Sequence, residues 1–213
     1  MSSEEIRDSL FEAALSRFRA QGYDQTSVAE LTRETGVAKG TFFNHFPTKE
    51  AILAEFVGRV WEEAAEASTR EGHRGTDEII HTLDGVMRRL ETDPAVTREV
   101  ALRLPSLSTP PALRSERDPG ADLLSDFWSR WIRVRIDQSL PIAVPIEEIT
   151  PEDLAALLVG AMIRTLAEGA TGPHRSPPPS DPLPLALSMG RRAVFLLRSA
   201  GYVAPDPPTG TSH

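Results

Sequence analysis

Residues 22–53, GYDQTSVAELTRETGVAKGTFFNHFPTKEAIL, give the clearest indication of the fold. This stretch contains both lysines of the chain, Lys39 and Lys49, and its only asparagine, Asn44. Elsewhere the chain uses arginine as its basic residue, and its net charge is -8. This acidic balance argues against broad affinity for nucleic acid, so any contact with DNA must be local.

Two short helices are expected within this stretch. Ser27 and Glu30 have the spacing of a capping box, which predicts a helix that starts after Ser27 and ends before Gly36. A second helix is expected from about residue 38 to residue 45, and Gly36 permits the left-handed backbone of the tight turn between them. Helices joined in this way form a helix-turn-helix, which offers its second helix to the major groove of DNA.

The second helix of this unit has two different faces. Phe42 and Phe46 fall on the same face and are expected to pack inward against Phe18 and Leu31. Lysine and threonine can read base edges, and a glycine lets the backbone approach DNA closely. Lys49, at the start of the following helix, is expected to contact a phosphate. The residues left facing outward are Lys39, Gly40, Thr41, Asn44 and His45.

Residues 5–57 resemble the DNA-binding domain of the TetR family of bacterial transcriptional regulators, and the match to its signature is nearly continuous over residues 22–53. The resemblance implies that Ser27 caps the second helix against a phosphate, that the third helix reads bases, and that Lys49 binds the DNA backbone. It also implies an all-helical C-terminal domain that binds a small ligand and forms a dimer.

The sequence departs from the family pattern at two positions. Phe43 stands where the family usually has tyrosine, so the phenol that would bond to a phosphate is missing, and Phe43 would pack on sugar or on a thymine methyl instead. Thr32 replaces the usual alanine where the two helices of the motif cross, and its hydroxyl is expected to bond to the carbonyl four residues earlier.

The remaining sequence also predicts helices, with no convincing strand. The apolar periodicity indicates about nine helices and an all-α fold. Asp93-Pro94, Thr150-Pro151 and Asp181-Pro182 are expected to start helices, and Pro105 to end one. We expect three parts: a three-helix DNA-binding domain at 1–47, a larger helical ligand-binding and dimerisation domain at 48–204, and a disordered tail at 205–213.

Two sets of residues follow from this plan. The ligand pocket would be lined by aromatic and polar residues of the helical body, although the spacing of Trp128 and Trp131 favours core packing over a ligand site by about two to one. The dimer interface would lie on the last two helices, because the helix at 152–170 is apolar on two sides. The expected pocket residues are His81, Met87, Arg103, Phe127, Trp128 and Trp131; those of the interface are Leu154, Leu158, Ala161, Met162, Leu187, Val194 and Phe195.

Several classes of protein are excluded or disfavoured by what the sequence lacks. It has no cysteine, no continuous apolar run of membrane-spanning length and no secretory signal pattern at its start, so a cytoplasmic location is expected. No metal-binding histidine spacing, glycine-rich phosphate loop or serine nucleophile elbow is present. We therefore expect no cofactor, no metal and no enzymatic activity.

The function that these patterns favour is a homodimeric regulator, most consistent with a repressor that a small-molecule effector releases from its double-stranded DNA operator. The alternative is a small-molecule binding or sequestering protein, or an enzyme, that keeps the helical body without binding DNA. The outward set of Lys39, Thr41 and Lys49 argues against this alternative.

Overall fold

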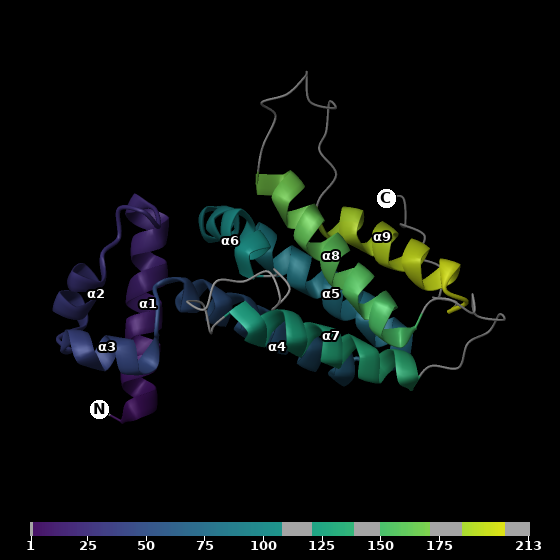
Figure 1. Ribbon diagram of the computed structural model, residues 1–213, viewed down its shortest axis with the longest axis horizontal. Coiled ribbons are helices and arrows are strands. Elements are labelled where there is room, and N and C mark those ends of the chain that lie inside the picture. The colour runs from purple at the N-terminus through teal and green to yellow at the C-terminus, as the bar shows by residue number, and fades with distance from the viewer. Residues whose placement is uncertain (1, 108–120, 139–149, 171–184, 203–213) are drawn as a thin grey trace, which may run out of the picture.

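The computed structural model describes residues 2–107, 121–138, 150–170 and 185–202, and Figure 1 shows their arrangement. These residues form nine helices and no strand, which confirms the predicted all-α class. The predicted tail at 205–213 lies outside the described residues. The helices are α1 (Ser3–Gln21), α2 (Val28–Thr35), α3 (Lys39–His45), α4 (Glu50–Arg70), α5 (Gly75–Glu91), α6 (Pro94–Leu107), α7 (Ala121–Asp137), α8 (Pro151–Ala170) and α9 (Leu185–Ser199).

Figure 1 shows two units, a small one made of α1 to α3 and a larger one made of α5 to α9. α4 leaves the small unit and packs along the larger one, mainly against α5. In the larger unit α8 packs against α6, α7 and α9, and α9 also packs against α5. None of the described helices is long and apolar enough to cross a membrane.

Local sequence signals fix the ends of α1 and α2. Ser2 with Glu5 and Ser27 with Glu30 each form a complete capping box, in which hydroxyl and carboxylate satisfy N–H groups at the helix start. Gly36 ends α2 in the left-handed region with φ 70°, and Val37 N–H donates to Thr32 O. The turn between α2 and α3 therefore has the geometry expected from the sequence.

The small unit is held together by a core of aromatic and aliphatic side chains. Phe42 and Phe46 of the α3 segment are fully buried together with Leu31 of α2, and Phe18 of α1 is nearly so. The predicted inward face of α3 is confirmed. Arg7 of α1 fixes the end of α3, because its Nη1 donates to His45 O at 2.7 Å and its guanidinium lies 4.6 Å from the centre of the Phe46 ring.

The structure agrees with some of the helix ends predicted for the larger unit and differs from others. Asp93 precedes α6 as expected, and its carboxylate accepts the Val96 N–H at 3.4 Å. Thr150 caps α8 reciprocally with Asp153. The prediction that Pro105 ends its helix was wrong, because α6 continues to Leu107. A proline inside a helix removes one backbone donor and crowds the carbonyl four residues earlier, and α6 extends only two residues beyond Pro105. The proposed start at Asp181-Pro182 lies outside the described residues, and α9 begins at Leu185.

Candidate nucleic-acid interface and effector region

The outer face of α3 presents an exposed set of polar and aromatic side chains. Lys39, Gly40 and Asn44 are exposed, whereas Thr41 and His45 are half-buried. Phe43 is 43% exposed, packs edge-on against the Phe42 ring, and lies 5.9 Å from the Lys39 ammonium. A side chain added at Gly40 would meet nothing within 4 Å, so a phosphate or base edge can approach the backbone there. The predicted residues are thus together on one surface.

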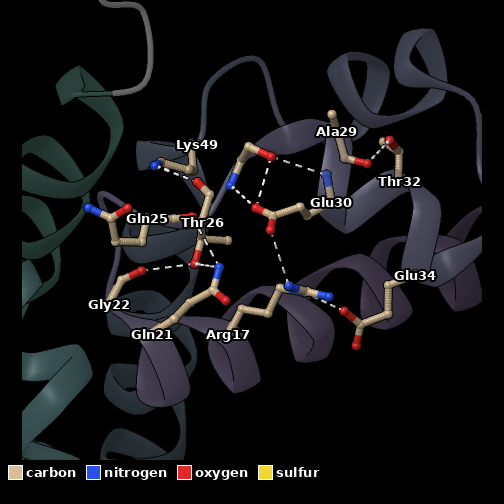
Figure 2. A network of polar contacts seen from close by, with 11 residues as sticks. Arg17, Gln21, Gly22, Gln25, Thr26, Ala29, Glu30, Thr32, Glu34 and Lys49 are labelled. Atoms are coloured by element: carbon tan, nitrogen blue, oxygen red, sulfur yellow. Dashed lines mark hydrogen bonds and ion pairs between the residues drawn. The ribbon is translucent and has the colours of Figure 1, made fainter.

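Ser27 stands at the exposed start of α2, and its partner Glu30 is labelled in the polar network of Figure 2. Its Oγ donates to Glu30 Oε2 at 2.9 Å and accepts the Glu30 N–H at 3.2 Å. The hydrogen bonds from Ser27 hold the pKa of the Glu30 carboxyl below its usual range. Arg17 of α1 lies 3.6 Å from the same carboxylate and also pairs with Glu34, which fixes α2 against α1.

Thr32 is buried where α2 crosses the neighbouring helices. Its hydroxyl donates to Ala29 O at 3.2 Å, three residues back rather than the four expected (Figure 2). The bond keeps the buried hydroxyl satisfied within its own helix, so threonine is accommodated at this position without a partner from α3.

Lys49 makes contacts within the protein that the sequence did not predict. Its Nζ donates to Tyr23 O at 2.7 Å and to Thr26 O at 2.8 Å, and it lies 3.9 Å from the centre of the Tyr23 ring. Burial lowers the pKa of the ammonium. Lys49 therefore ties the start of α4 to the turn between α1 and α2, and two of its three N–H donors are committed to the protein. Thr48 Oγ1 accepts the Ala51 N–H at 3.3 Å, directly before the start of α4.

Tyr23 lies at a junction between the small unit and the larger unit. The sequence did not reveal this junction. The Tyr23 ring is nearly fully buried, with the Lys49 ammonium near it and the Arg103 guanidinium of α6 at 3.8 Å. Arg103 also binds Asp24 at 2.8 Å, and Arg19 of α1 binds Asp93 at 2.7 Å. Because these partners are far apart in sequence, no local pattern could have indicated the junction.

Arg103 and His81, two of the predicted pocket residues, have partners elsewhere in the structure. Arg103 is held by Asp24, Glu99 and Tyr23 at the junction. His81 is partly exposed and stacks on His73 near the end of α4. Met87 is fully buried in the core. The Phe127 side chain lies outside the described part of the molecule.

The aromatic side chains of α4 and α7 form one cluster. The Trp61 ring stacks on Trp128 with centroids 5.6 Å apart and meets Trp131 edge-on at 5.3 Å. Among the described residues no protein atom accepts the buried N–H of Trp61 or Trp128, or bonds the buried hydroxyl of Thr82. Trp131 is half-buried at the edge of an open groove of about 510 Å³, which is also lined by Trp61, Glu62, Ala65, Glu66, Thr69, Arg70 and Arg135.

The outer surface of α8 and α9 differs from the predicted interface in three residues. Leu154, Leu158 and Met162 are buried within the protomer, because α8 turns this side toward the body. The exposed apolar residues lie on the other side: Phe195 is 69% exposed, and Leu157 and Leu187 are about half exposed, at 47% and 44%. Ala161 and Val194 are half-buried. A shallow groove of about 380 Å³ is lined by Leu157, Ala161, Arg191, Arg192, Phe195 and Leu196.

Sequence comparison supports the interpretation of the N-terminal unit as a helix-turn-helix domain. Residues 10–56 match the family described as "Bacterial regulatory proteins, tetR family". The HTH-type transcriptional repressor DhaR of Mycobacterium sp. is 32% identical over 96 residues, which are 40% of this chain and 48% of DhaR. The chain thus spans about half the length of DhaR. The HTH-type transcriptional repressor Rv1474c of Mycobacterium tuberculosis is 27% identical over 168 residues, 71% of this chain and 88% of that protein.

Structural comparison extends the likeness to the whole fold. The crystal structure of FadR from Thermus thermophilus, a TetR family transcriptional repressor in complex with lauroyl-CoA, superimposes with a TM-score of 0.68. It is 19% identical in sequence and covers 96% of this chain and 100% of its own. The N-terminal unit thus matches the DNA-binding domain of the TetR family of bacterial regulatory proteins, and the chain as a whole has the fold of a TetR family repressor.

Proposed function

We propose that the protein is a sequence-specific DNA-binding regulator that acts as a homodimeric repressor and is released from its operator by a small molecule. The outer face of α3 is the observation that carries the proposal. It combines an exposed Lys39, a Gly40 with free space around it and a half-exposed Phe43 on a helix whose other face is fully buried. Such a rigid helix with outward donors suits the major groove.

The exposed apolar surface of α8 and α9 supports the dimer. Phe195, Leu157 and Leu187 form part of an apolar surface that a soluble monomer would leave in contact with water. Arg191 and Arg192 border the groove beside Phe195 and supply a polar rim. A second copy of the chain, related by a two-fold axis, would cover this surface and place two α3 helices on one face of the DNA.

The effector would bind beside the tryptophan cluster between α4 and α7. The open groove there is lined by Trp61 and Trp131 together with two arginines, Arg70 and Arg135, and two glutamates, Glu62 and Glu66. This combination suits a molecule with an apolar body and polar or charged groups. FadR from Thermus thermophilus, which shares the fold, is described in complex with lauroyl-CoA, a molecule of this general kind.

The junction at Tyr23 offers a route from the effector region to the reader helix. α4 runs from Lys49, at the turn between α1 and α2, to the groove residues Thr69 and Arg70. Arg103 of α6 contacts the same turn, because its guanidinium lies over the Tyr23 ring and pairs with the Asp24 carboxylate. An effector that favours another position of α4 relative to α6 would move the small unit and so change the spacing of the two α3 helices in the dimer. Binding of the effector would thereby shift the population away from the DNA-bound state.

Alanine substitutions of Lys39 and Thr41 test the base-reading role. We expect each to weaken binding by roughly 1 to 3 kcal/mol at one particular base pair, because a base-edge contact is lost there. The measurement is fluorescence anisotropy of the full-length protein on an operator selected from genomic DNA and on its single-base variants. If both substitutions weaken binding equally on all sequences, neither residue reads bases, and if no DNA fragment is selected, the proposed function fails.

A second substitution tests position 43, where this chain has phenylalanine and the family usually has tyrosine. We expect Phe43→Tyr to tighten binding by about 0.5 to 1.5 kcal/mol on every operator variant, because the new hydroxyl can bond a phosphate. The half-exposed ring leaves the added oxygen outside the core, so folding should be unchanged. A loss confined to operators with one particular thymine would instead place Phe43 against that thymine methyl.

A further inference from the structure

We propose that the turn between α4 and α5 is a binding site for a divalent transition metal ion of the zinc type. The site is made by Glu71, His73 and His81, with Asp77 as its supporting carboxylate. One ligand atom from each of Glu71, His73 and His81 lies within 4.8 Å of the others. The inference is independent of DNA binding, because it depends only on this cluster.

The backbone of the turn brings these residues together. Gly72 and Gly75 adopt positive φ angles of 93° and 60°, which let the chain reverse directly after α4. His73 N–H donates to Ser68 O at 3.1 Å, so His73 is fixed against the last turn of α4. His81 is eight residues further on, in the second turn of α5, and its ring stacks on the His73 ring with centroids 3.5 Å apart.

The carboxylates are placed as a metal site requires. Asp77 Oδ2 contacts His73 Nδ1, which leaves His73 Nε2 facing Glu71 Oε2 at 3.5 Å. A carboxylate on one ring nitrogen orients the other nitrogen toward a metal, as in carboxylate–histidine–zinc arrangements. Asp77 Oδ1 also lies 3.5 Å from His81 Nε2, so this one carboxylate touches both rings.

The chemistry of the cluster selects the kind of ion. Two neutral imidazoles and two carboxylates carry a formal charge of about -2, which a divalent cation neutralises. Imidazole nitrogen suits zinc, copper and nickel, whereas magnesium and calcium prefer sites made only of oxygen. Glu71, His73 and His81 would supply three ligands and water the fourth, in a tetrahedral arrangement with ligand atoms about 3.3 Å apart.

Binding requires a modest rearrangement that the exposure of the side chains allows. Stacked rings direct their lone pairs in parallel, so one ring must turn for both to meet the same ion. The side chains of His73 and His81 are 22% and 39% exposed, and that of Glu71 is 66% exposed. The bound ion would then join the end of α4 to the second turn of α5.

The test is isothermal titration of the full-length chain, carrying no affinity tag, with zinc ions and with magnesium ions. We expect one zinc ion to bind per cluster, no binding of magnesium, and a higher melting temperature only with zinc. His81→Phe keeps a ring that can stack on His73 but offers no ligand atom, so zinc affinity should fall at least roughly tenfold while stability without zinc is kept. Asp77→Asn should weaken zinc binding by roughly 10 to 100-fold.

The matched control is His45→Asn, which removes a histidine from α3 and should leave zinc affinity unchanged. Absence of zinc binding in the unmodified chain overturns the proposal. Zinc binding that stays unchanged in His81→Phe, and also in the double variant with His73→Phe and His81→Phe, overturns the proposal as well. Circular dichroism checks the helical content of each variant. These outcomes leave the proposed DNA-binding function untouched.

Discussion

Phe195→Glu is expected to convert the protein from a dimer to a monomer and to weaken operator binding by roughly 1,000-fold or more, because a monomer presents one recognition helix instead of two. Phe195 is 69% exposed in the protomer, so glutamate there costs the monomer little. In a dimer that covers this surface, the same glutamate would be a buried, unpaired charge. Light scattering gives the oligomeric state, and anisotropy gives the affinity.

Leu102→Glu is the matched control for this experiment. Leu102 is 53% exposed on α6 and does not line the groove on α8 and α9, so the same change of an exposed apolar residue should alter neither assembly nor affinity. A Phe195→Glu protein that remains a dimer would show that the two copies meet elsewhere. An unmodified protein that is monomeric and still binds a palindromic operator tightly would contradict the dimeric mechanism itself.

Lys49→Met is expected to lower the stability of the protein by about 2 kcal/mol, because the Tyr23 and Thr26 carbonyls lose two charge-assisted hydrogen bonds. The loss corresponds to a melting temperature lower by roughly 4 to 8 °C for a chain of this size. The chain offers its own control in its other lysine. Lys39 is exposed on α3, so Lys39→Met should leave the melting temperature nearly unchanged and weaken DNA binding.

The two lysine variants therefore separate a supporting role from a contact with DNA. Calorimetry gives the melting temperatures, and anisotropy at several salt concentrations gives the number of phosphate contacts. If Lys49→Met melts like the unmodified protein but lowers the salt slope by about one unit, Lys49 binds a phosphate in the complex, as the sequence suggested. The two carbonyl bonds of the structure would then not contribute to stability.

The sequence predicted those features that depend on neighbouring residues. The capping box of Ser27 and Glu30, the turn at Gly36 and the inward face of Phe42 and Phe46 all follow from spacing within one or two helical turns. The exposed positions of Lys39 and Asn44 follow from the same periodicity. These features fix the position of α3 and of its outer face.

Features that depend on tertiary packing could not be predicted in this way. Apolar residues on both sides of α8 indicated two buried faces but not which one belongs to the protomer, so Leu158 was placed in the interface although it is buried in the core. Lys49 and Arg103 bind partners in the turn between α1 and α2, far away in sequence. His73 and His81 meet only because a turn with two positive-φ glycines reverses the chain before α5.

The role of α3 in reading DNA is tested most directly by hydroxyl-radical footprinting of the full-length protein on DNA selected from genomic fragments. We expect two protected half-sites of palindromic sequence, with centres one helical turn or a whole number of turns apart, because two α3 helices would enter successive major grooves on one face of the duplex. Lys39→Ala and Thr41→Ala should each change the preferred base at one position in both half-sites. Protection without sequence preference, or a pattern that both substitutions leave unchanged, would contradict the role of α3 as the reader of DNA.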